Sequence, residues 1–165
     1  MGMVGCFAAV SSETLQRLRA DPDSIEEYLN PNDGEGEPPN YFEVDKAWHG
    51  IHYLLTGRAE GGPEPLSLTV FGGEEFGPEV GYGAARFLTP AQVAEVSNAL
   101  ELLNSGVLRP RFDPQDMEGK DIYPEPIWVR EGEEAFEYLM ENFEPLKVLY
   151  RDAAIRGDGM LQWLS

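Results

Sequence analysis

The sequence has little cysteine, few basic residues and no long apolar run. Its one cysteine, Cys6, excludes a disulfide within the chain and is typical of a reducing compartment. No run of about 18 apolar residues is present, so we expect no transmembrane helix. The first residues also lack the basic and apolar regions of a signal peptide. We therefore expect a cytoplasmic protein.

The scarcity of positive charge narrows the classes of partner. The chain has 12 Lys and Arg residues against 30 Asp and Glu residues, a net charge of −18. A negative field repels nucleic-acid phosphates and anionic lipid surfaces, so we expect neither as a partner. It favours solubility, or fast and salt-sensitive association with a basic protein. The acidic segments 32–37 and 74–79 would form the surface for such a protein.

The remaining composition is that of an ordinary globular protein. Apolar residues make up 42% of the 165 residues and charged residues 25%, and neither a repeat nor a linker is visible, so we expect a single domain over residues 1–165. Apolar and β-branched runs predict strands at residues 3–10, 66–71, 84–88, 127–129 and 160–164. Because helical patterns separate these runs, we predict an α/β fold, a three-layer αβα arrangement with a mixed sheet, and keep α+β as the alternative.

Capping signals and apolar spacing place the helices. Starts are predicted at Ser11, at Asp21-Pro22 and at Thr89-Pro90, where Gln92 can complete a capping box. Further helices are expected at residues 44–56, with Gly57 as the terminating glycine, and at residues 133–142. Another is expected after Pro145, which we expect to break the chain's last helical region. The glycine-rich segments 30–40, 58–65 and 72–83 are predicted to be loops.

The predicted helix at residues 44–56 carries the most informative pattern. At about 100° per residue, one narrow arc is apolar and should face the core. Its residues are Val44, Trp48, Ile51 and Leu55. A second stripe beside it carries Asp45, His49 and His52, which include both histidines of the chain.

Three interpretations of this polar stripe remain open. The leading one is structural, with Asp45 near the helix start and the histidines bonded to nearby backbone. The second is a ligand-binding or catalytic site, with His49 or His52 as acid or base and Asp45 orienting it. The third is a metal site from the same three residues, because their spacing allows convergence, although the glutamate of a zincin motif is absent.

A glycine-rich segment, Gly81-Tyr82-Gly83, precedes Arg86 and offers a second candidate. Glycines allow backbone N–H groups to approach an anion, and an arginine can clamp it. No Gly-Lys-Ser/Thr sequence follows, so this is not a P-loop. A turn that needs a positive φ is the favoured interpretation. Cys6 lies in an apolar run, where burial is favoured over reactivity.

Three segments of the chain resemble the YfbM-like family of bacterial domains of unknown function. They are residues 1–7 (MGMVGCF), 45–57 (DKAWHGIHYLLTG) and 81–88 (GYGAARFL). Tyr123-Pro124, Trp128 and residues 150–157 continue the resemblance, which covers nearly the whole chain. The resemblance implies a compact bacterial α/β domain and no reaction, so it assigns no catalytic residue.

Two functional hypotheses follow. The leading one is a non-enzymatic acidic protein that binds a basic protein. The alternative is a small-molecule-binding or hydrolytic enzyme whose site is built from Asp45, His49, His52, Tyr82 and Arg86. The sequence offers no recognisable nucleophile, metal cage or phosphate cradle, so no cofactor is predicted and enzymatic activity stays open.

Overall fold

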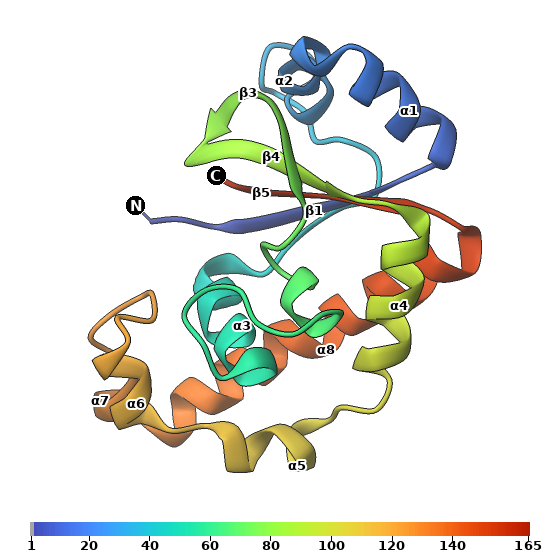
Figure 1. Ribbon diagram of the computed structural model, residues 1–165. Coiled ribbons are helices and arrows are strands. Elements are labelled where there is room, and N and C mark those ends of the chain that lie inside the picture. Colours follow the sequence, from blue (N-terminus) through green and yellow to red (C-terminus); the bar gives the residue numbers. More distant parts are fainter. Residues whose placement is uncertain (1) are drawn as a thin grey trace.

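A central antiparallel sheet organises the protein (Figure 1). The computed structural model describes residues 2–165, so Met1, which opens the first family-like segment, lies outside them. In this range five strands pair in the order β2-β1-β5-β4-β3. They are β1 (Gly5–Val10), β2 (Tyr41–Glu43), β3 (Glu74–Gly81), β4 (Gly83–Leu88) and β5 (Gly159–Leu164). The strands nearest the two ends of the chain, β1 and β5, are therefore neighbours at the centre.

The combination of helices and one sheet agrees with the predicted fold class, but the prediction of a mixed sheet was wrong. Every neighbouring pair of strands is antiparallel. The prediction rested on helical patterns between the strands, but the chain returns by turns and long excursions that reverse its direction. Antiparallel pairing is the feature expected of the α+β alternative.

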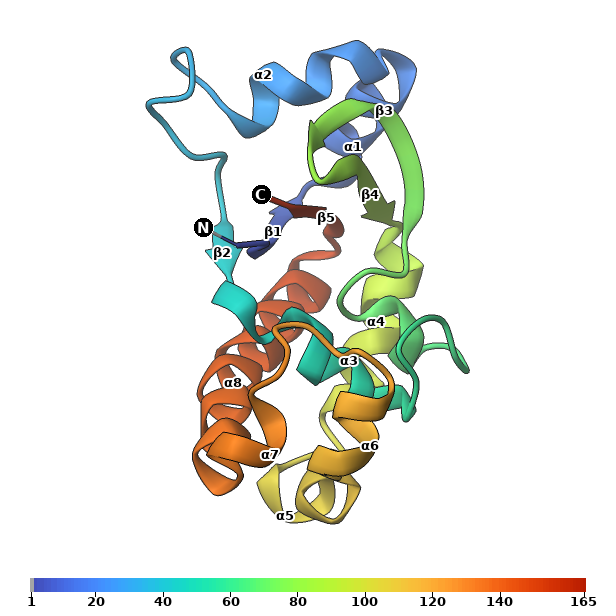
Figure 2. The ribbon, with the colours of Figure 1, turned by 90° about the vertical axis from the view of Figure 1, so that its left-hand side faces the viewer.

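Helices lie on both sides of the sheet (Figures 1 and 2). They are α1 (Ser12–Ala20), α2 (Ile25–Leu29), α3 (Trp48–Thr56), α4 (Pro90–Leu100), α5 (Ser105–Leu108), α6 (Pro114–Gly119), α7 (Trp128–Glu131) and α8 (Glu133–Arg156). The short α1 and α2 cover one face, and α3, α4 and α8 cover the other. None of the helices in the described range is long and apolar enough to cross a membrane.

Alternation along the strands creates the two cores. In β1, Cys6, Ala8 and Val10 contribute to the cluster under α1 and α2, and Phe7 and Ala9 contribute to the cluster under α3 and α8. Successive side chains of a strand point to opposite faces, so a fully apolar strand must be covered on both sides. The all-buried pattern of β1 and β5 has this cause.

Several predicted helix boundaries are confirmed. Thr89 caps α4, and its side chain and that of Gln92 form the reciprocal capping box. Ser11 caps α1 by accepting a hydrogen bond from the backbone of Thr14. Gly57 ends α3 in the left-handed conformation with φ of 74°, which a glycine adopts without the steric cost of a Cβ.

The segment 66–83 differs most from the prediction. Residues 66–68 form a 3₁₀ turn rather than a strand, and residues 74–81, expected in a loop, form β3. The register of β3 against β4 shifts between Phe76 and Glu79. Gly77 and Pro78 lie at this irregularity, so they interrupt the alternation that normally identifies a strand, on an edge where both residues are tolerated.

Two predictions in the C-terminal third were also wrong. Residues 127–129 begin α7 rather than a strand, and Pro145 lies inside a continuous α8. Phe143 and Leu146, on either side of the proline, are fully buried. Their packing against the sheet and neighbouring helices offsets the one backbone hydrogen bond that a proline removes.

Candidate functional site

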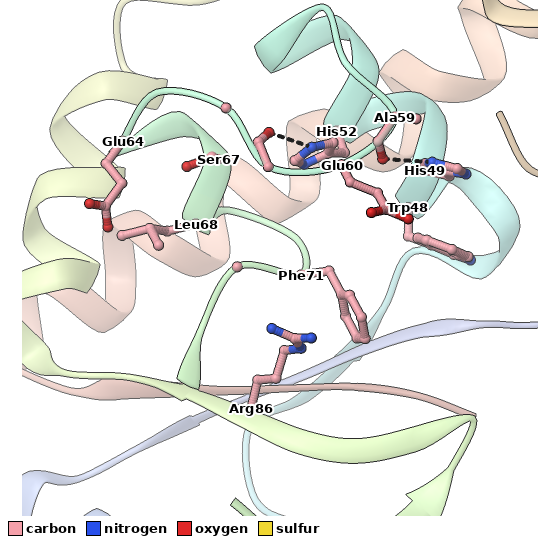
Figure 3. Close-up of a pocket in the computed structure, with 13 residues that line it drawn as sticks. Trp48, His49, His52, Ala59, Glu60, Glu64, Ser67, Leu68, Phe71 and Arg86 are labelled. Atoms are coloured by element: carbon pink, nitrogen blue, oxygen red, sulfur yellow. Dashed lines mark hydrogen bonds between the residues drawn. The ribbon is translucent and has the colours of Figure 1, made fainter. Parts of the chain in front are cut away.

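A cavity of about 660 Å³ lies between α3, the segment 58–73 and β4. Its α3 wall is formed by Trp48, His49 and His52, and Arg86 of β4 lies across from them (Figure 3). Three of the five residues proposed from the sequence therefore line one cavity. The segment 58–73 supplies the rest of the wall with side chains that sequence reasoning did not single out. They are Ala59, Glu60, Glu64, Ser67, Leu68 and Phe71.

The α3 wall is fixed by close packing against the C-terminal helices. A Cβ built on Gly50 would lie 2.6 Å from a methyl carbon of Leu139 and 2.8 Å from the ring of Trp128. Glycine is therefore needed for α7 and α8 to approach the back of α3 this closely. Ile51 and Leu55 are buried, as the predicted apolar arc requires.

Both ring nitrogens of His49 are bonded to backbone. The N–H of Tyr123 donates to Nδ1 at 2.8 Å, so Nε2 must carry the proton that it donates to the carbonyl oxygen of Ala59 at 2.9 Å. Burial lowers the pKa of this imidazole, although the Ala59 hydrogen bond and the charge of Glu60 act in the other direction. His49 is therefore neutral at pH 7 and ties the cavity's rim to α3 and to the segment around residue 123.

His52 makes the second such tie. Its Nε2 lies 3.0 Å from the carbonyl oxygen of Gly61, and a carbonyl can only accept, so Nε2 donates. Burial is again the main cause that lowers its pKa. The two histidines thus hold the carbonyl groups of residues 59 and 61 in place, which supports the structural interpretation of the polar stripe.

Arg86 closes the cavity on the side of the sheet. Its side chain points to the α3 face because it alternates along β4 with Ala85 and Phe87, which belong to the opposite core. The guanidinium donates to the carbonyl oxygen of Gly73 at 3.0 Å and to Glu75 at 2.8 Å. It also lies 4.3 Å from the ring centre of Phe71, within the range of a cation–π contact.

A buried polar network holds the segment 66–73, which forms the floor of the cavity. The sequence analysis missed this network. Gln162 of β5 has no exposed surface, and its Nε2 lies 2.7 Å from the carbonyl oxygen of Leu68 and 3.0 Å from that of Thr69. Its Oε1 accepts from the N–H of Gly73 at 3.3 Å. Gln162 thus replaces strand pairing for the segment 66–73. The signal was a lone glutamine inside the apolar run MLQWL.

Asp45 and Tyr82 do not join this cavity. Asp45 lies in a 3₁₀ turn before α3, and its Oδ2 accepts a hydrogen bond of 2.7 Å from the hydroxyl of Tyr138. Tyr82 is 52% exposed in the turn between β3 and β4. Residues 2–165 contain no group of three or more His, Cys, Asp or Glu residues placed to hold a metal ion. The structure therefore does not support the metal interpretation of Asp45, His49 and His52.

Comparison with known proteins identifies the family. The family described as "Domain of unknown function (DUF1877)" matches residues 1–163. Protein YfbM of Escherichia coli strain K12 is 31% identical over 98% of this chain and 97% of its own. The crystal structure titled as a protein of unknown function, YfbM from Escherichia coli, superimposes with a TM-score of 0.78 over 98% of this chain and 99% of that chain, at 26% identity. The chain belongs to the DUF1877 family, which confirms the resemblance.

Proposed function

We propose that this member of the DUF1877 family binds a small molecule in the cavity between α3 and β4. The observation that carries the proposal is that the two histidines of α3, His49 and His52, and the distant Arg86 of β4 line the same cavity. Its volume of about 660 Å³ lies within the range of roughly 300–1,000 Å³ of small-molecule sites.

The lining supports binding because it combines an apolar wall with a few fixed polar groups. Trp48, Leu68 and Phe71 supply apolar surface, and Ser67 and Arg86 supply hydrogen-bond donors. The wall is ordered before any ligand arrives, since the two histidines hold the rim and Gln162 holds the floor. Such preorganisation lowers the entropy cost of binding.

The same geometry favours binding over hydrolysis. Within residues 2–165, neither histidine is hydrogen-bonded to a hydroxyl or thiol, and both are bonded to backbone carbonyls. A general base needs a free lone pair beside the group that it deprotonates. His49 uses both nitrogens for structure, so we propose that this histidine shapes the site and does not act as an acid or base.

A crystallographic soak with small aromatic and aliphatic fragments tests this function. We expect fragments in the cavity beside Leu68 and Phe71. Phe71→Leu should weaken a fragment found there by severalfold in calorimetric titration, because it removes part of the apolar wall. The matched Phe112→Leu, which changes a ring packed on Phe136 outside the cavity, should not. Fragments bound only at other hollows, or none at all, would reject the function.

A basic protein partner stays a second proposal. Its support is the net charge of −18 and the exposure of Glu74 and Glu79 on the edge strand β3. Its acidic segment 74–79 is a strand rather than the predicted loop. Binding that does not weaken between low and physiological salt would exclude the electrostatic form of this proposal.

A single domain in a cytoplasmic location likewise stays a proposal, supported by the family match and by the buried, unpaired Cys6.

A further inference from the structure

Two carboxylates at the cavity have no partner in the described structure. Glu60 and Glu64 line its opening and are exposed, and within residues 2–165 neither side chain makes an ion pair or a hydrogen bond. Figure 3 draws the carboxylate of Glu60 turned towards Phe71 and Trp48, with Glu64 at the other end of the opening. Glu60 lies between Ala59 and Gly61, whose carbonyl groups the two histidines hold in place.

The one arginine that lines the cavity in the described residues has a carboxylate partner, although its buried Nε has no hydrogen-bond partner. Arg86 forms an ion pair of 2.8 Å with Glu75 and donates to the backbone of Gly73. His49 is neutral, because its Nδ1 accepts from the N–H of Tyr123, and burial lowers the pKa of His52, which disfavours its charged form. The unbalanced charge at the opening is therefore that of Glu60 and Glu64.

We propose that the ligand of this cavity is a small organic cation, with its ammonium or guanidinium group beside Glu60 and its apolar part against Phe71. This inference rests on the proposed small-molecule function. An anion would approach two unpaired carboxylates, and the arginine that lines the cavity, Arg86, already has Glu75 as its counter-charge. The net charge of −18 raises the local concentration of cations and lowers that of anions.

Three probes of similar size and different charge test the inference. They are benzylamine, benzyl alcohol and benzoate, titrated calorimetrically at low salt. We expect benzylamine to bind most tightly and benzoate most weakly. Raising the salt to physiological strength should weaken benzylamine and leave benzyl alcohol unchanged, because only the first interaction is between charges.

Single variants locate the charge that is responsible. Glu60→Gln should weaken benzylamine by about two- to fivefold, the range of an exposed ion pair, and leave benzyl alcohol unchanged. Glu64→Gln, at the other end of the opening, should weaken benzylamine less. Glu13→Gln is the matched control. It makes the same change in net charge on α1, across the sheet from the cavity, and should leave both affinities unchanged.

The outcomes separate the inference from the function on which it rests. Benzoate binding as tightly as benzylamine, or variants at Glu60 and Glu64 that leave benzylamine unaffected, would overturn the cationic ligand and leave a small-molecule site. Failure of all three probes and of every fragment to occupy the cavity would overturn both.

Discussion

Replacing Gln162 by leucine removes the support of the cavity floor. In the native protein this side chain bonds the carbonyl oxygens of Leu68 and Thr69 and the N–H of Gly73. Leucine has a similar volume and no polar atom, so the change isolates the hydrogen bonds. Thr69 keeps a partner, because its carbonyl oxygen also accepts from the hydroxyl of Tyr150.

The loss in free energy of unfolding follows from the two backbone groups that Gln162→Leu leaves without hydrogen-bond partners. The Leu68 carbonyl and the Gly73 N–H would each lose a buried hydrogen bond, at about 1–3 kcal/mol apiece, or about 2–6 kcal/mol together. For a chain of this size, each kcal/mol lowers the melting temperature by roughly 2–4 °C. We therefore expect Gln162→Leu to lower it by at least about 4 °C. Tyr150→Phe leaves every backbone group paired and should cost only about 1 kcal/mol.

Urea unfolding followed by tryptophan fluorescence measures both variants under the same conditions. The expected order is wild type, then Tyr150→Phe, then Gln162→Leu, with similar slopes against urea. If the Gln162→Leu variant were as stable as Tyr150→Phe, the claim that hydrogen bonds from Gln162 stabilise the segment 66–73 would be refuted.

Three further predictions concern pH, packing and a thiol. The pKa values of His49 and His52 are lower in the folded protein than in the unfolded chain, so the unfolded chain binds more protons below about pH 6.5. The free energy of unfolding should fall as pH drops from 7 to 5, by at most about 1.4 kcal/mol per pH unit for each histidine. Urea titrations at several pH values should show that a His49→Gln/His52→Gln variant lacks this pH dependence. Gly50→Ala should lower stability by about 1–3 kcal/mol, because its Cβ would overlap side chains of α7 and α8, whereas Gly119→Ala, which meets open space, should not lower it in thermal melts. Burial raises the pKa of Cys6 to about 11, so Ellman's reagent should react with it only after unfolding, and rapid labelling of the native protein would contradict its burial.

The sequence predicted elements whose signals are local. The capping box at Thr89, the end of a helix at Gly57 and an apolar strand within residues 3–10 depend on neighbouring residues. All three are present, the strand as Gly5–Val10. The apolar arc of α3 also placed His49 and His52 on one side of the helix, beside the core.

The sequence could not predict features that depend on distant partners. Leu66 to Phe71 has the composition of a strand, but the amide of Gln162 bonds its carbonyls in place of a neighbouring strand. Asp45 belonged to the polar stripe by spacing, yet it precedes the regular helix and bonds Tyr138 instead. The rim of the cavity was recognised only as a loop, because nothing local shows that two histidines hold it.

The most direct test of the ligand site follows the indole N–H signals of the tryptophans by NMR during a benzylamine titration. Trp48 lines the cavity, whereas Trp163 packs in the core on the other face of the sheet. We predict that the Trp48 signal and the backbone amides of residues 59–62 shift together and saturate, while the Trp163 signal stays in place. A saturating titration in which the Trp48 signal and those amides do not move, or move no more than Trp163, would contradict a ligand site in this cavity.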